Sequence, residues 1–193
     1  MKIPHAQIEA LLREAAEQII VPLWKNLGEE DVTEKSEGDI TTSADTRCEA
    51  FLASHLFGLI TGSLVLGEES VHEDPGLLSS LHTDAPVWVI DPLDGTRYFA
   101  AGQPQFAIMV CLIQSGMTIG AWILKPLDGI LTSAERGCGF VRRLDGTEYT
   151  PVDDRKGLLC ATNPENVEID SADAGAVHYD SPYAPVRLLL QVG

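Results

Sequence analysis

The amino-acid sequence predicts an α+β fold in which an N-terminal pair of helices packs on a largely antiparallel sheet. Two amphipathic segments with helical periodicity come first, over residues 5–21 and 42–59, and apolar runs separated by turn residues follow. Helices followed by consecutive strands are typical of a layered α+β arrangement. With 193 residues, the chain is long enough for one large domain, or for one domain and part of a second.

The first segment predicts a helix that ends near Pro22. Its apolar stripe comprises Ile8, Leu11, Leu12, Ala15, Ile19 and Val21. Proline lacks a backbone N–H group and is disfavoured in the interior of a helix, so we expect the helix to stop there.

A polar stretch over residues 28–39 is expected to form a loop or loose hairpin before the second helix. Thr42 or Ser43 supplies the cap of this helix, and Asp45 lies in its first turn. One face is apolar and comprises Cys48, Phe51, Leu52, Leu56 and Leu59.

Short apolar runs then predict the strands. In chain order they cover residues 63–66, 87–90, 106–113, 118–124, 129–134 and 139–143. The third and fourth runs are joined by Gln114-Ser115-Gly116, which is typical of a hairpin, and a turn at 144–147 closes the series.

The composition excludes some classes of partner. Thirteen basic and 29 acidic residues give a formal charge of −16. Such a field repels nucleic-acid backbones and anionic membranes, so we expect neither as a partner. The four cysteines contain no C-x-x-C pair, and no apolar run approaches membrane-spanning length. The sequence therefore predicts a cytoplasmic protein with reduced thiols.

Three acidic residues follow predicted strands. Glu68 follows the first strand, and Asp91 and Asp94 follow the second. Strands of one sheet deliver the residues after them to a shared edge, so these carboxylates can converge. Hard cations such as Mg²⁺ prefer oxygen ligands and retain several waters. We therefore expect a magnesium site at this edge.

The segment Asp91-Pro92-Leu93-Asp94-Gly95-Thr96 combines metal ligands with a phosphate cradle. Pro92 fixes the backbone, so that both aspartates can turn toward one point. Gly95 allows a close approach or an unusual backbone angle, and a helix starting at Thr96 would offer free N–H groups to a phosphate. The alternative is an ordinary turn, since these residue types favour turns. The buried strand before the segment and the upstream Glu68 favour the metal site.

These motifs, in their order, resemble the inositol monophosphatase family, within the Mg²⁺-dependent, lithium-sensitive superfamily that includes fructose-1,6-bisphosphatase. The resemblance rests on Gly67-Glu68-Glu69-Ser70, on Trp88 to Thr96, on Phe99, Gly102, Pro104 and Phe106, and on the upstream segment from Lys35 to Asp45. It runs from the first helix to about Tyr149 and implies a layered α/β sandwich of the sugar-phosphatase type.

The resemblance also implies roles for individual residues. Glu68, Asp91 and the Leu93 carbonyl would bind a first Mg²⁺, Asp91 and Asp94 a second, and Glu68 would help to hold a third through water. Leu93, Asp94, Gly95 and Thr96 would contact the substrate, with the phosphate at Gly95 and Thr96. Asp45, paired with the Thr96 hydroxyl, would polarise the attacking water, which makes Asp45, Glu68 and Thr96 the catalytic residues.

One feature of the family has no match in the sequence. Members carry a further metal-binding aspartate in a Trp-Asp segment of the C-terminal domain, and no Trp-Asp pair occurs here. We therefore expect an N-terminal metal-binding α+β domain over residues 1–150 and a partial or truncated C-terminal α/β domain over residues 151–193. Metal binding and activity would be weakened accordingly.

The expected function is Mg²⁺-dependent hydrolysis of a small phosphate monoester, similar to inositol monophosphate, by metal-activated water. Histidinol phosphate and 3′-phosphorylated nucleotides are alternative substrates, because related families share the metal motif and Arg97 follows Thr96 as in those relatives. An alternative of another class is a truncated, non-catalytic domain that binds metal or a partner. The partners implied by the resemblance are a small phosphorylated metabolite and a second copy in a homodimer.

Overall fold

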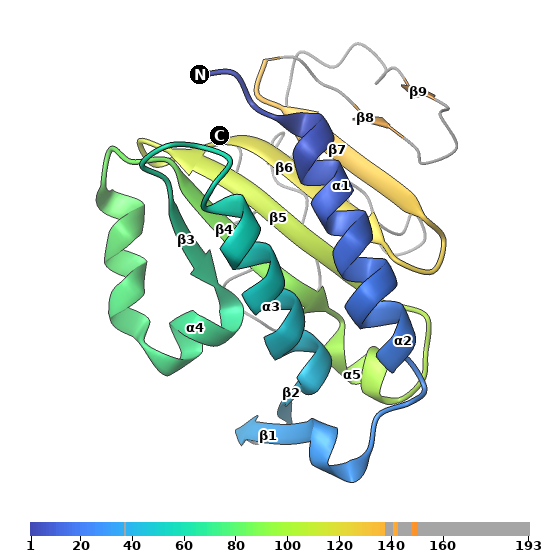
Figure 1. Cartoon of the computed structure of the whole chain (residues 1–193). Coiled ribbons are helices and arrows are strands. Elements are labelled where there is room, and N and C mark those ends of the chain that lie inside the picture. Colours follow the sequence, from blue (N-terminus) through green and yellow to red (C-terminus); the bar gives the residue numbers. More distant parts are fainter. Residues whose placement is uncertain (37, 138–140, 143–147, 150–193) are drawn as a thin grey trace, which may run out of the picture.

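The computed structural model describes residues 1–36, 38–137, 141–142 and 148–149 of the chain. It has a layered α+β architecture, in which helices cover a mixed sheet, as the sequence predicts (Figure 1). No helix of this described part is long and apolar enough to cross a membrane.

The central sheet has five strands in the order β3-β4-β5-β6-β7. The strands are β3 Leu64–Gly67, β4 Val87–Asp94, β5 Ala107–Gln114, β6 Met117–Lys125 and β7 Ile130–Glu135. Only β3 and β4 are parallel within this sheet, and the other neighbours are antiparallel, so the prediction of a largely antiparallel sheet is confirmed. The hairpin predicted around Ser115 joins β5 to β6.

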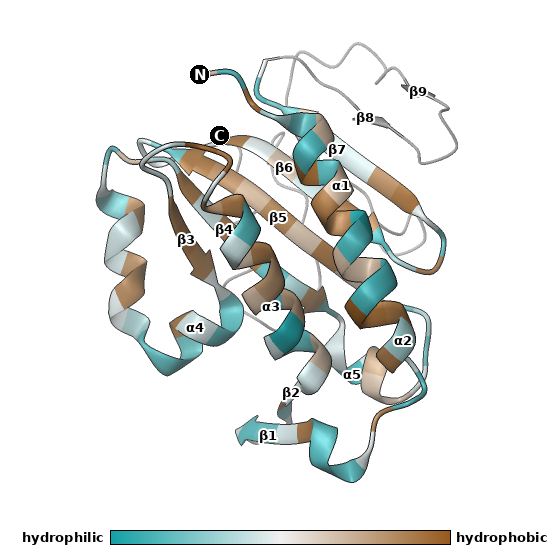
Figure 2. Cartoon of the chain, in the orientation of Figure 1, coloured by the Kyte–Doolittle hydropathy of each residue, from teal (hydrophilic) through white to brown (hydrophobic). Residues whose placement is uncertain are grey.

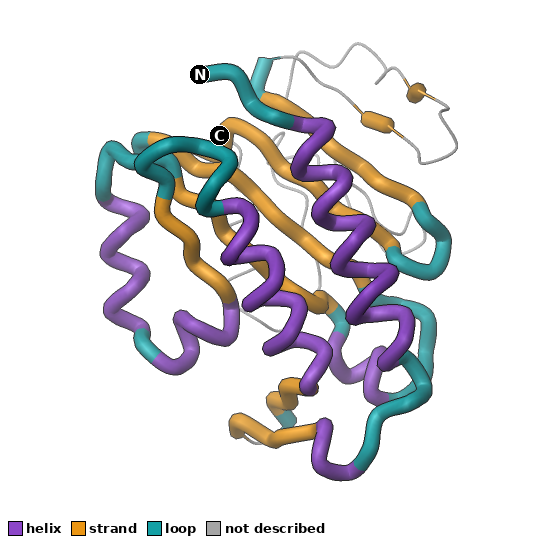
Figure 3. Tube along the Cα trace, in the orientation of Figure 1, coloured by secondary structure: helices purple, strands orange, loops and turns teal. Residues whose placement is uncertain are grey.

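Two helices lie side by side on one face of the sheet, α1 (His5–Ala15) and α3 (Ser43–Leu56) (Figures 1 and 3). Both present their apolar stripes to the strands, and the resulting core includes Leu12, Leu52, Trp88 and Trp122, all fully buried. The hydropathy colouring shows the same division, with brown strands beneath helices whose outer faces are largely teal (Figure 2). The predicted helix pair is therefore confirmed.

The first helix contains a π-helical turn, before Pro22, that the sequence did not predict. The chain passes from α1 into a π-helical turn, Ala16–Ile20, and then into α2, Val21–Leu23, so it stays helical beyond the proline. Pro22 therefore lies in the last turn of a continuous helical run, directly after the π-helical turn. The run ends at Leu23, one residue after Pro22, so the predicted end near Pro22 is confirmed.

The second face of the sheet carries its own apolar cluster. Its buried members are Leu66, Val87, Ala107, Met109, Cys111, Ile113, Ala121 and Ile123. Leu77 and Leu81 pack against this cluster from the 3-10 helix η3, Pro75–His82, which follows α4, Glu68–Glu73. The central strand β5 is buried along nearly all of its length, which explains its continuous apolar run.

A hairpin and two short helices, α4 and α5, lie at the end of the sheet where β3 and β4 finish (Figure 1). The predicted loose hairpin is β1 (Val32–Ser36) and β2 (Asp39–Thr42), preceded by the 3-10 turn η2 (Glu29–Asp31). Helix α5, Thr96–Ala100, contacts β2, and α4 begins directly after β3. This end of the sheet therefore assembles the segments on which the sequence places its candidate residues.

Part of the predicted meander lies outside the described residues. Of the run at 139–143, β8 (Val141–Arg142) is described, and it pairs with β9 (Glu148–Tyr149) in a separate antiparallel sheet. The turn at 144–147 and the second domain expected over 151–193 fall among residues that the structure does not describe.

Candidate metal and phosphate site

The ends of β3 and β4 bring two carboxylates together. The parallel register pairs Gly67 with Ile90, so Glu68 and Asp91 each lie one residue beyond that pair. Their carboxyl groups are close enough to share a proton. The predicted convergence of these two side chains is confirmed, although β4 itself continues beyond Asp91 to Asp94.

Burial raises the pKa values of all four carboxyl groups of an acidic cluster, which comprises Asp45, Glu68, Asp91 and Asp94. Burial raises the pKa of Asp91 well above its usual value, and the charges of the other three carboxylates raise it further. Burial also raises the pKa values of Asp45 and Asp94 to about 6, and that of Glu68 against the opposing charge of Lys35. A bound cation would remove this repulsion.

The oxygen donors at the cluster fit a hydrated divalent cation. Asp91 Oδ1 is buried and has no hydrogen-bond partner among the residues that the structure describes. The Leu93 carbonyl accepts one hydrogen bond, 2.9 Å from the Thr96 hydroxyl, and keeps a second lone pair. No three His, Cys, Asp or Glu side chains of the described ranges form a ready metal cage. The predicted ligand sets need only two carboxylates with a carbonyl or water, which Mg²⁺ accepts.

The segment from Asp91 to Thr96 is an irregular strand end followed by a helix start. The pairing of β4 with β5 shifts register between Asp91 and Asp94, around Pro92. Gly95 then adopts a left-handed conformation with φ of 85°, and a Cβ there would lie 2.4 Å from the Gln105 carbonyl oxygen. Both predicted reasons for this glycine are confirmed, and α5 begins at the next residue.

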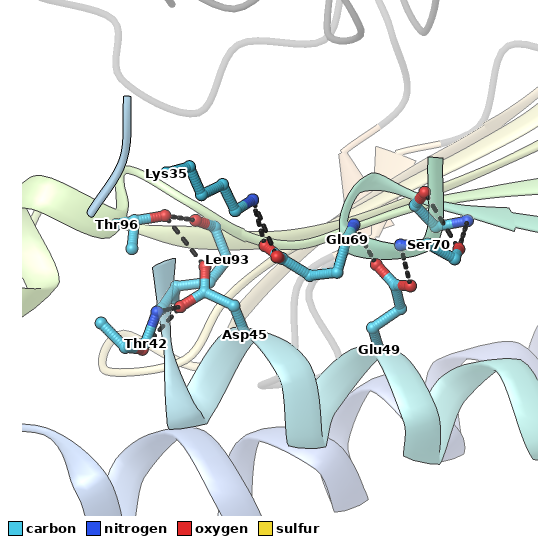
Figure 4. A network of polar contacts seen from close by, with 9 residues as sticks. Lys35, Thr42, Asp45, Glu49, Glu69, Ser70, Leu93 and Thr96 are labelled. Atoms are coloured by element: carbon cyan, nitrogen blue, oxygen red, sulfur yellow. Dashed lines mark hydrogen bonds and ion pairs between the residues drawn. The ribbon is translucent and has the colours of Figure 1, made fainter. Parts of the chain in front are cut away.

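Asp45 links the second helix to this segment. Its Oδ2 accepts hydrogen bonds from the Thr42 N–H and hydroxyl groups, at 2.9 and 2.5 Å, and its Oδ1 accepts one from the Thr96 hydroxyl at 2.9 Å (Figure 4). Thr42 is the cap of α3 and forms a capping box with Asp45, so the cap is Thr42 and not Ser43. The predicted pairing of Asp45 with Thr96 is confirmed.

Two further acidic side chains flank the cluster, and the sequence did not single them out. Glu69 pairs with Lys35 from β1 at 2.7 Å, and Glu49 from α3 accepts hydrogen bonds from the N–H groups of Glu69 and Ser70 (Figure 4). Glu49 had a detectable signal: it lies one helical turn after Asp45 and next to Cys48, on the side that the apolar residues mark as buried. A carboxylate on a buried face requires polar partners.

Arg97 contacts the hairpin formed by β1 and β2. Its guanidinium group donates a hydrogen bond to the carbonyl of Gly38, in the turn between β1 and β2. This hydrogen bond connects α5, which begins at Thr96, to the hairpin that carries Lys35.

The sequence and the structure were compared with those of known proteins, and the matches agree on one family. A model of the inositol monophosphatase family matches residues 5–172, which extends beyond Tyr149, where the recognised motifs end. A Nus factor SuhB of Vibrio cholerae is 29% identical over 160 residues, covering 82% of this chain and 58% of that protein. An inositol-1-monophosphatase of Rhizobium meliloti is 38% identical over 109 residues, covering 56% of this chain and 38% of that protein.

Solved structures show the same fold. The extragenic suppressor protein suhB of Bartonella henselae superposes with a TM-score of 0.58 at 27% identity, covering 70% of this chain and 50% of that chain. The chain thus spans about half the length of the relatives that it matches.

Proposed function

Because this chain belongs to the inositol monophosphatase family, we propose that it carries the metal- and phosphate-binding part of a Mg²⁺-dependent phosphatase acting on small phosphate monoesters. The observation that carries this proposal is the convergence of Glu68 and Asp91 beside the Asp45–Thr96 hydrogen bond, with a buried Asp91 Oδ1 to which no other described residue donates a hydrogen bond. A plain turn at Asp91 to Thr96 would not need four carboxylates with raised pKa values around it.

Four residues would hold the metal ions. Glu68, Asp91 and the Leu93 carbonyl supply one set of donors, and Asp91 and Asp94 supply a second. When bound, Mg²⁺ supplies Lewis acidity at the phosphate oxygens and lowers the pKa of water. An acidic protein would otherwise repel an anionic substrate. Cations bound at the acidic cluster would make the local charge positive and so favour phosphate binding.

The chain's own residues would position phosphate and water. Gly95 caps α5, which begins at Thr96, and the backbone N–H groups of this first turn would donate hydrogen bonds to a phosphate. The single proton of the Thr96 hydroxyl is shared between two acceptors, Asp45 Oδ1 and the Leu93 carbonyl, so the Thr96 oxygen can accept a hydrogen bond from the attacking water. The buried Asp45 thereby sets the direction of that hydrogen bond and stabilises charge as the water loses a proton.

The leading substrate class is an inositol or sugar monophosphate. A second class, 3′-phosphorylated nucleotides, is supported by a relative named 3′(2′),5′-bisphosphate nucleotidase CysQ, of Aggregatibacter actinomycetemcomitans. It is 32% identical over 112 residues, which cover 58% of this chain. Histidinol phosphate is the third candidate, because related families share the metal motif.

Phosphate release tests the proposal. The chain would be incubated with inositol 1-phosphate, histidinol phosphate and a 3′-phosphorylated nucleotide, with Mg²⁺ or with a chelator. We expect Mg²⁺-dependent release from one class, and a loss of roughly two orders of magnitude or more in Asp91→Asn, since the shared ligand of both ions is changed. His82→Gln changes an exposed residue at the end of η3, before β4, whereas the cluster lies at the far end of β4; this control should retain turnover.

Two outcomes separate the proposal from the alternative of a non-catalytic domain. Turnover that is unchanged in Asp91→Asn refutes the site. No metal-dependent turnover of any substrate leaves this chain as a metal-binding or interaction domain of the family, and a sedimentation measurement would then test whether it forms the expected homodimer.

A further inference from the structure

Glu49 lies beneath the start of α4 and is almost enclosed, with 7% of its surface exposed. Its Oε2 accepts a hydrogen bond from the Glu69 N–H group at 2.7 Å, and its Oε1 accepts one from the Ser70 N–H group at 2.9 Å. These N–H groups belong to the first turn of α4, where a helix offers donors that it cannot satisfy itself. Each oxygen of the carboxylate therefore has its own backbone donor.

Gly67 makes room for this contact. A Cβ on Gly67 would lie 2.0 Å from the carboxyl carbon of Glu49, so a side chain at position 67 would expel the carboxylate. Gly67 is also the cap of α4 and has no side chain to accept the first-turn N–H groups. Glu49, a residue of α3, therefore caps these first-turn N–H groups of α4.

Glu68 lies between two fixed neighbours. Gly67 is held by its pairing with Ile90 in the sheet, and the Glu69 N–H group is held by Glu49. The direction in which Glu68 leaves the backbone is therefore set by the sheet on one side and by α3 on the other.

Helix α3 contacts both halves of the site. Asp45 accepts a hydrogen bond from Thr96, and Glu49, one turn later, holds the start of α4 (Figure 4). Residues four apart lie on the same helix face, so one rigid element fixes the distance between the phosphate side and the Glu68 side.

We propose that Glu49 is a positioning residue, which aims the Glu68 carboxylate at the metal ion by holding the first turn of α4. The inference rests on the proposed function, because it assumes that Glu68 binds a divalent cation. Residues that support metal ligands from behind commonly change metal affinity by 10- to 100-fold when they are replaced.

The test compares how Mg²⁺ stabilises four proteins against heat. In Glu49→Gln, the amide NH₂ group faces one of the two backbone N–H groups, so one hydrogen bond is lost with little change in shape. We expect Mg²⁺ affinity, taken from the rise in Tm with concentration, to fall about 10-fold or more. Glu49→Asp keeps the charge but is one methylene too short to reach both N–H groups, so it should show a comparable fall and serves if the first variant does not fold.

Leu52→Ala is the matched control. Leu52 lies on the same helix, is fully buried, and belongs to the apolar core. Its truncation should lower Tm while leaving Mg²⁺ affinity within about twofold of the wild type, because the hydrogen bonds of Glu49 remain. Hydrogen exchange gives a readout without metal: the Glu69 and Ser70 amides should exchange faster in Glu49→Gln than in Leu52→Ala of equal stability.

The outcomes distinguish the inference from the proposed function. A wild-type chain whose Tm does not respond to Mg²⁺ overturns the metal site, and the inference with it. A wild type that responds, with Glu49→Gln and Glu49→Asp responding equally well, overturns the inference alone. An affinity loss in Leu52→Ala as large as in Glu49→Gln also overturns it, since metal binding would then follow overall stability.

Discussion

The Lys35–Glu69 ion pair connects the hairpin to the first turn of α4. The side chains are only 7% and 13% exposed, and the charged atoms lie 2.7 Å apart. Burial lowers the pKa of Lys35, but the hydrogen bond and charge of Glu69 outweigh it, with smaller contributions from Glu68 and Asp39, so the pKa is raised. Glu69 therefore balances the positive charge of a Lys35 side chain that is largely buried.

Glu69→Gln should be strongly destabilising, because it leaves the buried ammonium group without its carboxylate. We expect a loss of about 3–5 kcal/mol in the free energy of unfolding, measured with urea. Glu135→Gln is the matched control: Glu135 pairs with His5, and its side chain is 34% exposed, so we expect a loss below about 1 kcal/mol. Equal losses in the two variants would contradict this account.

The effect of Glu69→Gln should depend on pH in one direction. The folded-state pKa of Lys35 is raised, so the stability from this pair is fully present below the pKa of the unfolded state. It is lost as the pH rises through the folded-state pKa, because a neutral amine needs no carboxylate. Unfolding at a series of alkaline pH values should therefore show a shrinking difference between the wild type and Glu69→Gln, and a growing difference would be inconsistent with the pair.

At the scale of elements, the sequence predicts the parts whose periodicity is simple. The apolar run at 106–113 and its partner after Ser115 become a hairpin because burial on both faces favours unbroken apolar strands. The π-helical turn at Ala16–Ile20 was not predictable, since an extra residue in one turn leaves the apolar stripe almost unchanged. The extension of β4 through Pro92 was missed because proline normally marks a strand's end.

The loop into α5 provides a test of why Gly95 is required. Gly95→Ala places a Cβ 2.4 Å from the Gln105 carbonyl oxygen and also strains a φ of 85°. Gly116→Ala, in the turn between β5 and β6, has a similar φ of 73° but nothing within 4 Å. We expect the control to cost about 1 kcal/mol and Gly95→Ala about 3 kcal/mol or more in thermal unfolding. Similar losses would show that backbone strain alone explains this glycine.

At the scale of the whole molecule, the site depends on segments far apart in the sequence. The motif residues Asp45, Glu68, Asp91 and Thr96 could be predicted because their order and spacing resemble those of the family. The Lys35–Glu69 pair could not, because it comes from a contact between β1 and α4 that no local pattern encodes. Glu49 has a partial signal in its place on the buried face of α3, but its hydrogen-bond partners in α4 come from the fold. The fold supplies these supporting residues, whereas the sequence motif supplies the ligands.

The net charge of the whole chain is unfavourable for binding an anionic substrate. With a formal charge of −16, the protein repels anions unless cations intervene. The acidic cluster gathers several of these charges in one buried place, where Asp91 Oδ1 has no hydrogen-bond partner within the described part of the chain. A metal ion at the cluster would remove the repulsion among the carboxylates and create a local attraction for phosphate.

Calorimetric titration with Mg²⁺ tests the central claim most directly, because it measures metal binding without a substrate. We predict saturable binding to the wild-type chain and none detectable at the same concentrations for Asp91→Asn, with circular dichroism showing that the variant is folded. Binding of equal affinity to both proteins, or no binding to the wild type, would contradict the assignment of this cluster as the metal site.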